Sequence, residues 1–261
     1  MLIVLKYGGN AMAAPSAEDP LLDDVAERVA GGDRVVLVHG GGPQIDAALE
    51  ERGIVTHRVA GLRVTDAATL AVTESVLCGT VNKAIVRALL VRGALAAGLS
   101  GQDGALLEAR PLAIDGRSLG YVGEIVRVIP RVLHALLDAG FVPVIAPLGI
   151  TRDGATALNV NADTAAGAIA GALGADAYVV VTNVPRVRRL VDDPATEIAR
   201  LTIAEAHAYL ADGTFDGGMR PKMESALDAL AAGAASAVIC GGGRGALSRA
   251  LDGHGTTIVA S

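Results

Sequence analysis

Short aliphatic runs alternate with longer alanine-rich amphipathic stretches along most of this chain, and that alternation restricts its fold more than any other feature. The pattern is typical of βαβ units, in which helices cover both faces of a mostly parallel sheet. We therefore expect an α/β fold, a three-layer αβα sandwich whose parallel crossovers are right-handed. The runs that predict strands are 2–6, 34–39, 141–146, 178–182 and 237–240.

Helical periodicity predicts the covering helices, and one further segment departs from the pattern. Within 105–128, a turn-rich stretch at 114–118 separates two strand-like runs, which predicts an antiparallel hairpin at one end of the sheet. No change of composition suits a linker, so we expect one domain over residues 1–261, with two lobes that divide near residue 150. The expected helices are 21–30, 44–52, 67–92 with a break at Gly79, 130–139, 164–173, 203–211 and 222–232.

Charge and composition exclude several classes of function. A formal net charge of −6 opposes binding to the phosphate backbone of nucleic acids, and 2% aromatic residues leave no stacking platform for bases. Residues 1–6 resemble a β-strand rather than a signal peptide, and no apolar run is long enough to span a membrane. Cys78 and Cys240 lack metal-ligand spacing, so neither a disulfide nor a metal site is indicated. We expect a cytoplasmic protein without a nucleic-acid or membrane partner.

Lysine is rare in this chain. Of the 22 Lys and Arg residues, all but Lys6, Lys83 and Lys222 are arginine. Because arginine supplies nearly every other positive charge, each lysine raises the question of why a compact ammonium group is present. Lys222 begins an expected helix, where the positive end of the helix dipole disfavours a cation. A negatively charged ligand would compensate for that cost, and an ordinary exposed lysine is the alternative.

Glycine loops follow the first two expected strands. Residues 6–10 read Lys-Tyr-Gly-Gly-Asn, and residues 39–44 read His-Gly-Gly-Gly-Pro-Gln. Ligands of open α/β sheets bind at the carboxyl ends of strands, where glycine lets backbone N–H groups approach an anion. Neither loop matches GxxxxGK[ST] or GxGxxG, which excludes a P-loop NTPase and argues against a dinucleotide-binding enzyme. The alternative is that strand-to-helix turns need glycine for backbone reasons alone.

A polar cluster lies in the second half of the chain. Asn159, Asn161 and Asp163 alternate with apolar residues, so an extended backbone would point all three to one side. Asp163 also suits the N-cap of the next helix, which would leave the two asparagines unexplained. Between Lys6 and Lys222, Asp163 would reduce the repulsion of two ammonium groups placed around a phosphoryl group. A carboxylate acceptor is already ionised at neutral pH and needs no general base, and no base stands out here.

Eight motifs in order resemble the acetylglutamate kinases of the amino acid kinase family, from residue 2 almost to the C-terminus. The resemblance implies that ATP phosphorylates the γ-carboxylate of N-acetyl-L-glutamate in arginine synthesis. It also implies a lobe over 1–150 for the acyl amino acid and dimer contact, and a lobe over 151–261 for the nucleotide. The motifs are KYGGNAM at 6–12, VHGGGPQ at 38–44, GLRVTD at 61–66, VNK at 81–83, GLSG at 98–101, GYVGE at 120–124, the stretch 159–167 and GMRPK at 218–222.

The resemblance implies a role for individual residues. Lys6 and Lys222 would stabilise the transition state, and Asp163 would organise them. Mg²⁺ would be held mainly by the ATP phosphates and water. The residues implied at the acyl amino acid and the transferred phosphoryl group are Gly9, Gly41, Gly42, Arg63 and Asn159. The residues implied at the nucleotide are Gly8, Thr182, Asn183, Val184, Gly218 and Met219.

Departures from the family pattern keep two alternatives open. Asn183 stands where the family usually has Asp, and residues 186–189 are unusually basic. These features would suit a related kinase that acts on carrier-linked aminoadipate in lysine synthesis, although the intact Gly-Gly-Gly-Pro-Gln run favours free acetylglutamate. A non-catalytic nucleotide or amino-acid sensor is the second alternative. The first strand begins at Leu2, whereas arginine-inhibited hexameric members have an additional N-terminal helix, so we expect a homodimer that arginine does not inhibit.

Overall fold

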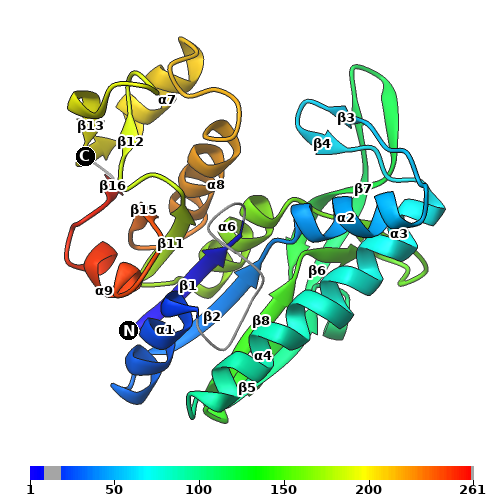
Figure 1. Cartoon of the computed structure of the whole chain (residues 1–261), viewed down its shortest axis with the longest axis horizontal. Coiled ribbons are helices and arrows are strands. Elements are labelled where there is room, and N and C mark those ends of the chain that lie inside the picture. The colour runs from blue at the N-terminus through cyan, green and yellow to red at the C-terminus, as the bar shows by residue number, and fades with distance from the viewer. Residues whose placement is uncertain (9–18, 260–261) are drawn as a thin grey trace.

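The computed structural model describes residues 1–8 and 19–259, and an eight-stranded sheet runs through its middle in the order β14-β16-β15-β11-β1-β2-β8-β5 (Figure 1). Only β15 and β16 pair antiparallel, so the predicted mostly parallel sheet is confirmed. The five predicted strands are all present within a residue or two. The strands are β1 (Leu2–Tyr7), β2 (Arg34–His39), β5 (Ala96–Ser100), β8 (Val142–Ala146), β11 (Ala177–Thr182), β14 (Arg200–Thr202), β15 (Ala237–Gly241) and β16 (Thr256–Val259).

Helices cover both faces of this sheet, which confirms the three-layer arrangement. Alternate residues of β1 point to opposite faces, so Val4 enters one apolar core while Ile3 and Leu5 enter the other. The core around Val4 packs against α5 (Arg131–Asp138), α6 (Ala162–Leu173), α7 (Ile203–Ala211) and α8 (Arg220–Ala231). The core around Ile3 packs against α1 (Pro20–Ala30), α2 (Gly42–Glu51), α3 (Ala67–Glu74), α4 (Asn82–Val91) and α9 (Ala246–Leu251).

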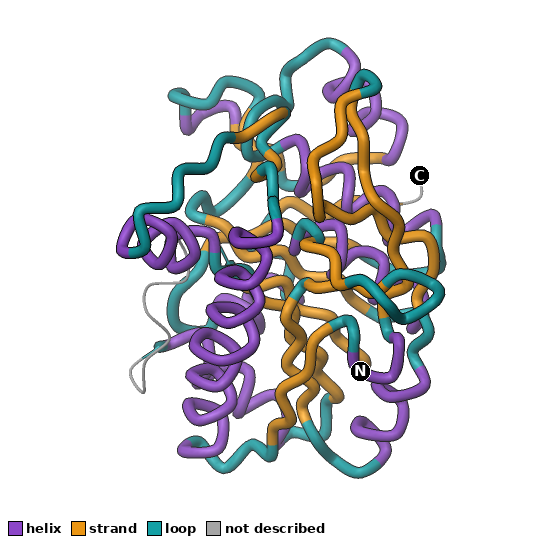
Figure 2. The backbone as a smooth tube through the Cα atoms, turned by 90° about the vertical axis from the view of Figure 1, so that its right-hand side faces the viewer, coloured by secondary structure: helices purple, strands orange, loops and turns teal. Residues whose placement is uncertain are grey.

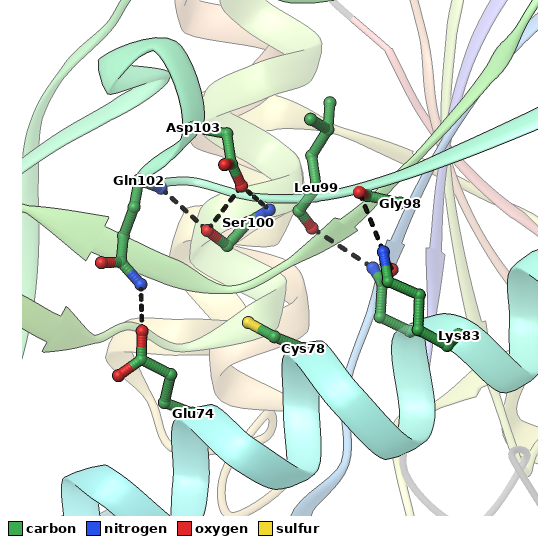
Figure 3. Close-up of a pocket in the computed structure, with 9 residues that line it drawn as sticks. Glu74, Cys78, Lys83, Gly98, Leu99, Ser100, Gln102 and Asp103 are labelled. Atoms are coloured by element: carbon green, nitrogen blue, oxygen red, sulfur yellow. Dashed lines mark hydrogen bonds between the residues drawn. The ribbon is translucent and has the colours of Figure 1, made fainter.

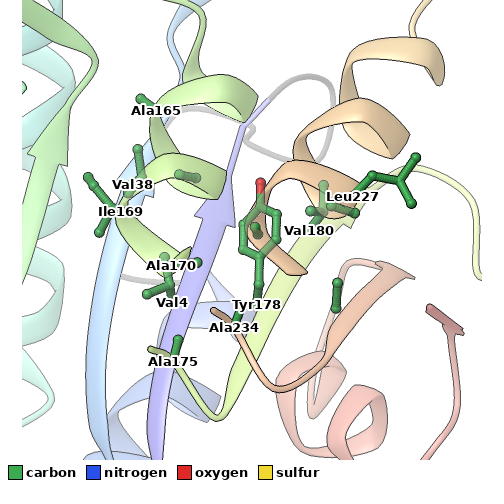
Figure 4. Close-up of a cluster of buried hydrophobic side chains, with 14 of the residues drawn as sticks. Val4, Val38, Ala165, Ile169, Ala170, Ala175, Tyr178, Val180, Leu227 and Ala234 are labelled. Carbon is green, nitrogen blue, oxygen red and sulfur yellow. The ribbon is translucent and has the colours of Figure 1, made fainter. Parts of the chain in front are cut away.

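Figure 4 shows the first of these cores at close range. Ala165 and Ile169 of α6 pack over Val4 and Val38 of the two central strands. The ring of Tyr178 is fully buried in this apolar layer. Small residues on α6 let the helix approach its neighbour α8 closely. A side chain at Gly167 would lie 2.5 Å from the carbonyl oxygen of Ser225, so the two helices could not pack this way without glycine there.

The predicted break at Gly79 is wrong. A π-helical segment, Ser75–Val81, joins α3 to α4, and the backbone stays helical at both junctions. Gly79 lies inside this segment, with open space where a side chain would be. A π-helical turn holds more residues than an α-helical turn, so the helix continues past Gly79 without a break. Figure 2 faces this side of the molecule and shows the helices beside the strands.

The predicted hairpin is present, but its predicted place is wrong. β6 (Leu107–Ile114) and β7 (Arg117–Val128) pair antiparallel and turn at Asp115 and Gly116, both with positive φ. They close with β9 (Leu148–Ile150) and β10 (Ala157–Asn159) into a small separate barrel, instead of extending the central sheet. The β6–β7 pair has two register shifts with extra residues in β7, and interruptions of this kind, such as β-bulges, bend a strand.

Two short hairpins and two 3₁₀ turns, Asp103–Ala105 and Pro194–Thr196, complete the described secondary structure. The hairpins are β3 (Arg58–Val59) with β4 (Leu62–Arg63), and β12 (Val187–Arg188) with β13 (Glu197–Ile198). Within residues 1–8 and 19–259, no helix is both long enough and apolar enough to cross a membrane.

Candidate active site

The side-chain alternation of β1 determines where Lys6 lies. Lys6 shares its face of the strand with Val4, so it points toward α6 and α8 rather than toward α1. Both of these helices start near the carboxyl end of β1 and bring their first turns to Lys6. The Lys6 side chain is 4% exposed, which is rare for an ammonium group that has no counter-ion.

Asp163 supplies that counter-ion from the first turn of α6. The sequence offered Asp163 as the N-cap of this helix, but the structure places Asn161 there. The Asn161 side chain accepts from the N–H groups of Asp163 at 2.8 Å and Thr164 at 3.1 Å. The predicted extended segment ends at this cap, since residues from Ala162 onward are helical. Because Asn161 satisfies the helix end, the carboxylate of Asp163 is free for other partners.

Asp163 joins the two lysines that the sequence singled out. Lys6 Nζ lies 3.0 Å from Asp163 Oδ1, and Lys222 Nζ lies 3.1 Å from Asp163 Oδ2. Burial lowers the pKa of Lys6, the positive charge of Lys222 adds to that effect, and the charge of Asp163 opposes it. Burial alone would raise the pKa of Asp163, but the two ammonium groups outweigh it and hold the pKa below its usual value. The three groups therefore form one coupled buried cluster.

Tyr178 and Ser225 connect the backbones that carry this cluster. The Tyr178 hydroxyl donates to the carbonyl of Asp163 at 3.1 Å and lies 3.1 Å from Ser225 Oγ. Ser225 Oγ donates in turn to the carbonyl of Lys222 at 2.9 Å. Sequence reasoning missed both residues, although a tyrosine inside the aliphatic run 177–181 is a signal that could have found one of them.

A cavity of about 260 Å³ opens beside the cluster, at the carboxyl ends of β1 and β2. The glycine loop at residues 40–42 forms part of its wall. The other glycine loop approaches closely, because a side chain at Gly8 would lie 3.0 Å from Gly40 N and 3.3 Å from Lys6 Nζ. Gly41 is the N-cap of α2, whose positive dipole end faces this region. Gly9 lies outside the described residues. The residues that line the cavity include Lys6, Gly40, Gly41, Gly42, Arg58, Arg63, Leu77, Asn159, Asp163 and Lys222.

Arg63 and Asn159, both expected at the substrate, do line this cavity. Arg63 is buried and donates to Asp46 Oδ1, and its Nη2 donates to the carbonyl of Gly42 at 3.3 Å. Arg58 donates to the other oxygen of Asp46 at 3.0 Å. Asn159 Nδ2 donates to Thr65 Oγ1 at 3.2 Å. Sequence reasoning missed Arg58 and Asp46, which no motif marks.

The charges around this cavity favour an anion. Four cationic side chains line it, and Asp163 is the single carboxylate among its described lining residues. Pairs of ammonium and guanidinium groups with backbone N–H donors suit oxyanions such as carboxylate and phosphate. The chain as a whole is acidic, so this local excess of positive charge is specific to the site.

Residues expected at the nucleotide are only partly brought together. Val184 and Met219 line a second cavity of about 280 Å³, together with Arg186 and the buried ring of Phe215. Thr182, Asn183 and Gly218 are not among its lining residues. Thr182 is buried at the end of β11, and its hydroxyl donates to Asn183 Oδ1 at 3.2 Å. Gly8 belongs to the first site, beside Lys6.

No group of three or more His, Cys, Asp or Glu that could hold a metal ion occurs in residues 1–8 and 19–259. In the central cavity, both oxygens of Asp163 are occupied by lysines. The described side chains therefore form no cluster of carboxylates around a divalent cation.

Comparison with known proteins adds independent information. Residues 1–241 match the amino acid kinase family. The acetylglutamate kinase of Acidiphilium cryptum is 47% identical over 250 residues, covering 92% of this chain and 82% of that protein. The acetylglutamate kinase of Methanopyrus kandleri is 46% identical over 259 residues, covering 98% of this chain and 99% of that protein.

Solved structures agree with that result. The structure of smu.665 from Streptococcus mutans superposes with a TM-score of 0.84 at 30% identity, and the match covers 100% of this chain and 99% of that one. The N-acetylglutamate synthase of Neisseria gonorrhoeae complexed with coenzyme A and N-acetyl-glutamate has a TM-score of 0.84 at 28% identity. That match covers all of this chain and 59% of the synthase.

Proposed function

This chain belongs to the amino acid kinase family, and from that premise we propose that it is an acetylglutamate kinase. It transfers a phosphoryl group from ATP to the γ-carboxylate of N-acetyl-L-glutamate and forms N-acetyl-L-glutamyl 5-phosphate, a step of arginine biosynthesis. The relatives at 46–47% identity over more than nine-tenths of the chain carry this activity in their names. The observation on which the assignment depends most is the Lys6–Asp163–Lys222 cluster beside the glycine loop.

The cluster supports this chemistry through charge alone. Phosphoryl transfer spreads negative charge over three equatorial oxygens, and catalysis consists mainly of positioning and electrostatic stabilisation. Lys6 and Lys222 approach Asp163 from different elements, β1 and α8, so their ammonium groups can contact a phosphoryl group from two sides. The acceptor is a carboxylate that is ionised at neutral pH, so no side chain has to remove a proton.

The remaining walls of the cavity suit an acylated dicarboxylic amino acid. Arg63 has the planar guanidinium that pairs with a carboxylate through two hydrogen bonds, and we assign it to the α-carboxylate of the substrate. Asn159 contributes an amide from β10 to the lining of the same cavity. The N–H groups of Gly9, Gly41 and Gly42 are assigned to the γ-carboxylate and the transferred phosphoryl group.

The nucleotide is assigned to the side of the molecule built from β11, α8 and their loops. The cavity with Val184, Phe215 and Met219 offers apolar contact for a base, while Arg186 supplies a cation at its edge. Gly8, Thr182, Asn183 and Gly218 are assigned to the path between that cavity and Lys6. Mg²⁺ would be held mainly by the ATP phosphates and water, and it would neutralise part of the phosphate charge.

The protein is proposed to act as a homodimer. β5 is the terminal strand of the eight-stranded sheet, and apolar side chains gather beside it. Leu90, Val91 and Leu95 are 47%, 76% and 55% exposed, which is unusual for three aliphatic residues within one short stretch. Light scattering coupled to gel filtration tests this, since a dimer has about twice the chain mass of 26.2 kDa. A monomer at micromolar concentration would contradict it.

A coupled ADP-release assay tests the activity. The purified chain is given MgATP with N-acetyl-L-glutamate, glutamate, N-acetyl-aspartate, N-acetyl-aminoadipate or carrier-linked aminoadipate. We expect turnover with N-acetyl-L-glutamate to exceed turnover with every other acceptor, and a hydroxylamine trap to detect the acyl phosphate. Preference for carrier-linked aminoadipate would replace this function by the lysine-pathway kinase. No ADP release with any acceptor at saturating MgATP would indicate a sensor.

A further inference from the structure

Three residues outside the catalytic cluster form a hydrogen-bonded chain that ends at the glycine loop, and the proposed function assigns no role to them. They are Lys83 and Asn82, at the start of α4, and His39, at the end of β2. His39 points to the face of the sheet opposite to Lys6, and its ring is fully buried. His39 directly precedes the glycine loop at residues 40–42. A hydrogen bond that holds its ring can therefore also restrict the orientation of the next residue, Gly40.

The hydrogen bonds among these residues define the orientation of each group. Asn82 Nδ2 lies 2.8 Å from the carbonyl of Val144 and 3.2 Å from both the carbonyl of Leu99 and His39 Nε2. Carbonyls can only accept, so Nδ2 is the amide donor, and its two hydrogens serve three neighbours, with the one nearest His39 Nε2 shared with a carbonyl. Lys83 Nζ donates to the remaining amide atom, Asn82 Oδ1, at 3.2 Å. The orientation of the Asn82 amide is therefore fixed at both of its ends.

The same reasoning fixes the histidine tautomer. His39 Nδ1 lies 2.8 Å from the carbonyl oxygen of Gly40, which cannot donate, so Nδ1 carries the proton and Nε2 accepts from Asn82. Burial lowers the pKa of His39 to about 4, and nearby Lys83 acts in the same direction against the Gly40 carbonyl. The ring is therefore neutral at physiological pH, as an acceptor at Nε2 requires.

Peptide geometry carries this constraint into the cavity. The carbonyl of Gly40 and the N–H of Gly41 belong to one planar trans peptide, so they point in opposite directions. With the carbonyl held by His39, the Gly41 N–H is directed away from the ring. That N–H makes no hydrogen bond within the described part of the chain, and Gly41 lines the central cavity. Leu77 of the π-helical segment packs against the glycine loop, since a side chain at Gly41 would lie 2.6 Å from Leu77 Cδ2.

Gly98 leaves space for Asn82 and Lys83, and Figure 3 shows the Lys83 side chain reaching Gly98. Lys83 Nζ donates to the carbonyl of Gly98 at 3.1 Å, and a side chain at Gly98 would lie 1.9 Å from Asn82 Oδ1 and 2.6 Å from Lys83 Nζ. Asn82, Lys83 and Gly98 line a cavity of about 350 Å³ beside β5. It shares no lining residue with the cavity beside the catalytic cluster. Lys83 therefore lies at the end of this connection that is farther from Lys6, Asp163 and Lys222.

We propose that Lys83, Asn82 and His39 are positioning residues that direct the Gly41 N–H toward the transferred phosphoryl group. The proposal rests on the proposed kinase function and adds to it a role for the lysine of the VNK motif. Lys83 orients the Asn82 amide, Asn82 selects the histidine tautomer, and His39 orients the Gly40–Gly41 peptide. None of the three contacts the reacting atoms.

Steady-state kinetics with matched variants test the proposal. Lys83→Met removes the ammonium group, and Arg87→Met removes a cation one turn further along α4 as the control. Because the effect passes through other residues, we expect Lys83→Met to lower kcat about tenfold, with the KM for ATP and the melting temperature unchanged. His39→Gln removes the donor to Gly40 and should lower kcat about a hundredfold, whereas His39→Asn keeps a donor near Nδ1 and should recover most of that loss. Equal kcat values for Lys83→Met and wild type, or for the two His39 variants, would overturn the proposal.

A binding measurement separates this result from failure of the kinase assignment. Inorganic phosphate is titrated into ¹⁵N-labelled protein, and the amide resonance of Gly41 is followed in wild type, His39→Gln and Gly98→Ala, with Gly79→Ala as the glycine control. We expect the phosphate-induced shift in wild type and Gly79→Ala, and its reduction by at least half in the other two. A shift of equal size in all four proteins overturns the positioning role, even if N-acetyl-L-glutamate is not the acceptor.

Discussion

Lys6 and Lys222 stand near opposite ends of the chain, yet each contacts a different oxygen of the same carboxylate, at 3.0 and 3.1 Å. Lys6 reaches it from the central strand β1, and Lys222 reaches it from the first turn of α8. Two ammonium groups this close would repel each other strongly in a buried site. Asp163 makes their proximity possible, so an anion that enters the cavity meets two cations that are already in place.

Replacing Lys222 by arginine should damage catalysis more than binding. The planar guanidinium keeps the positive charge but cannot place it as a point charge 3.1 Å from Asp163. We expect Lys222→Arg to lower kcat by about a hundredfold or more. Calorimetry should find the affinity for acetylglutamate nearly unchanged. Unaltered turnover would remove Lys222 from the mechanism.

Asp163 should be as important for stability as for activity. Removing its charge leaves the buried Lys6 without a counter-ion, and breaking a buried pair in this way costs about 3–5 kcal/mol. We therefore expect Asp163→Ala to lower the free energy of unfolding by about that amount in urea titrations. Asp138→Asn is the control, because its carboxylate is exposed and makes a long contact of 3.4 Å with Arg34. If both variants unfold at the same urea concentration as wild type, the cluster has no role in stability.

Arg63 should govern substrate affinity rather than turnover. Lysine at this position keeps the charge but loses the two-pronged contact with a carboxylate. We expect Arg63→Lys to raise the KM for acetylglutamate by about tenfold or more while kcat changes little. Asp46→Asn is the companion variant, because Asp46 accepts from both Arg63 and Arg58 and holds the buried guanidinium in place. A KM unchanged in both variants would contradict a substrate role for this pair.

Local sequence was sufficient for much of the fold because the central strands are buried on both faces and read as unbroken aliphatic runs. β5, with the sequence Ala-Ala-Gly-Leu-Ser, escaped prediction because none of these residues favours a strand by itself. It is held in place by pairing with β8 over five residue pairs. The barrel was also hidden, since β9 and β10 have only three residues each and the register shifts of the β6–β7 pair, where β7 carries the extra residues, have no local sequence pattern.

The candidate site divides in the same way. Glycine loops and isolated lysines are local signals, so Lys6, Asp163 and Lys222 could be proposed together before their distances were known. The roles of Asn161 and Asp163 could not be separated, because either residue can cap a helix and only the backbone shows where α6 begins. Contacts such as Arg58 with Asp46 and Asn82 with His39 join distant segments with no local pattern, so only the tertiary structure identifies them.

Asp24 should contribute to stability far from the active site. This buried carboxylate on α1 accepts from Leu247 N at 2.6 Å and Ser248 N at 3.0 Å, although 223 residues separate Asp24 from Leu247. It also accepts from Ser248 Oγ at 2.7 Å, so it caps α9 from another helix. Because hydrogen bonds to a buried charge are strong, Asp24→Ala should cost about 2–4 kcal/mol in urea unfolding. Glu27→Ala, on the exposed side of α1, should change stability by less than about 0.5 kcal/mol.

His39 should give the protein an acid-sensitive component of stability. Its pKa falls from 6.5 to about 4 in the folded protein, so between these values the unfolded chain binds a proton that the folded chain does not. The free energy of unfolding must therefore decrease as pH falls from about 6.5 to 4, by up to about 3 kcal/mol from this residue. The groups that face the ring are Asn82, the Gly40 carbonyl and, through Asn82, Lys83.

Urea titrations at pH 7, 6, 5 and 4 compare wild type with His39→Asn, which has no titrating ring. Carboxylates elsewhere titrate in both proteins, so the difference between the two curves isolates His39. We expect His39→Asn to be the less stable protein at pH 7, because the hydrogen bond with Asn82 is lost, and its deficit to shrink steadily toward pH 4. Parallel curves across this range would mean that folding does not change the pKa of His39, and the acid-sensitive component of stability attributed to its buried ring would then be wrong.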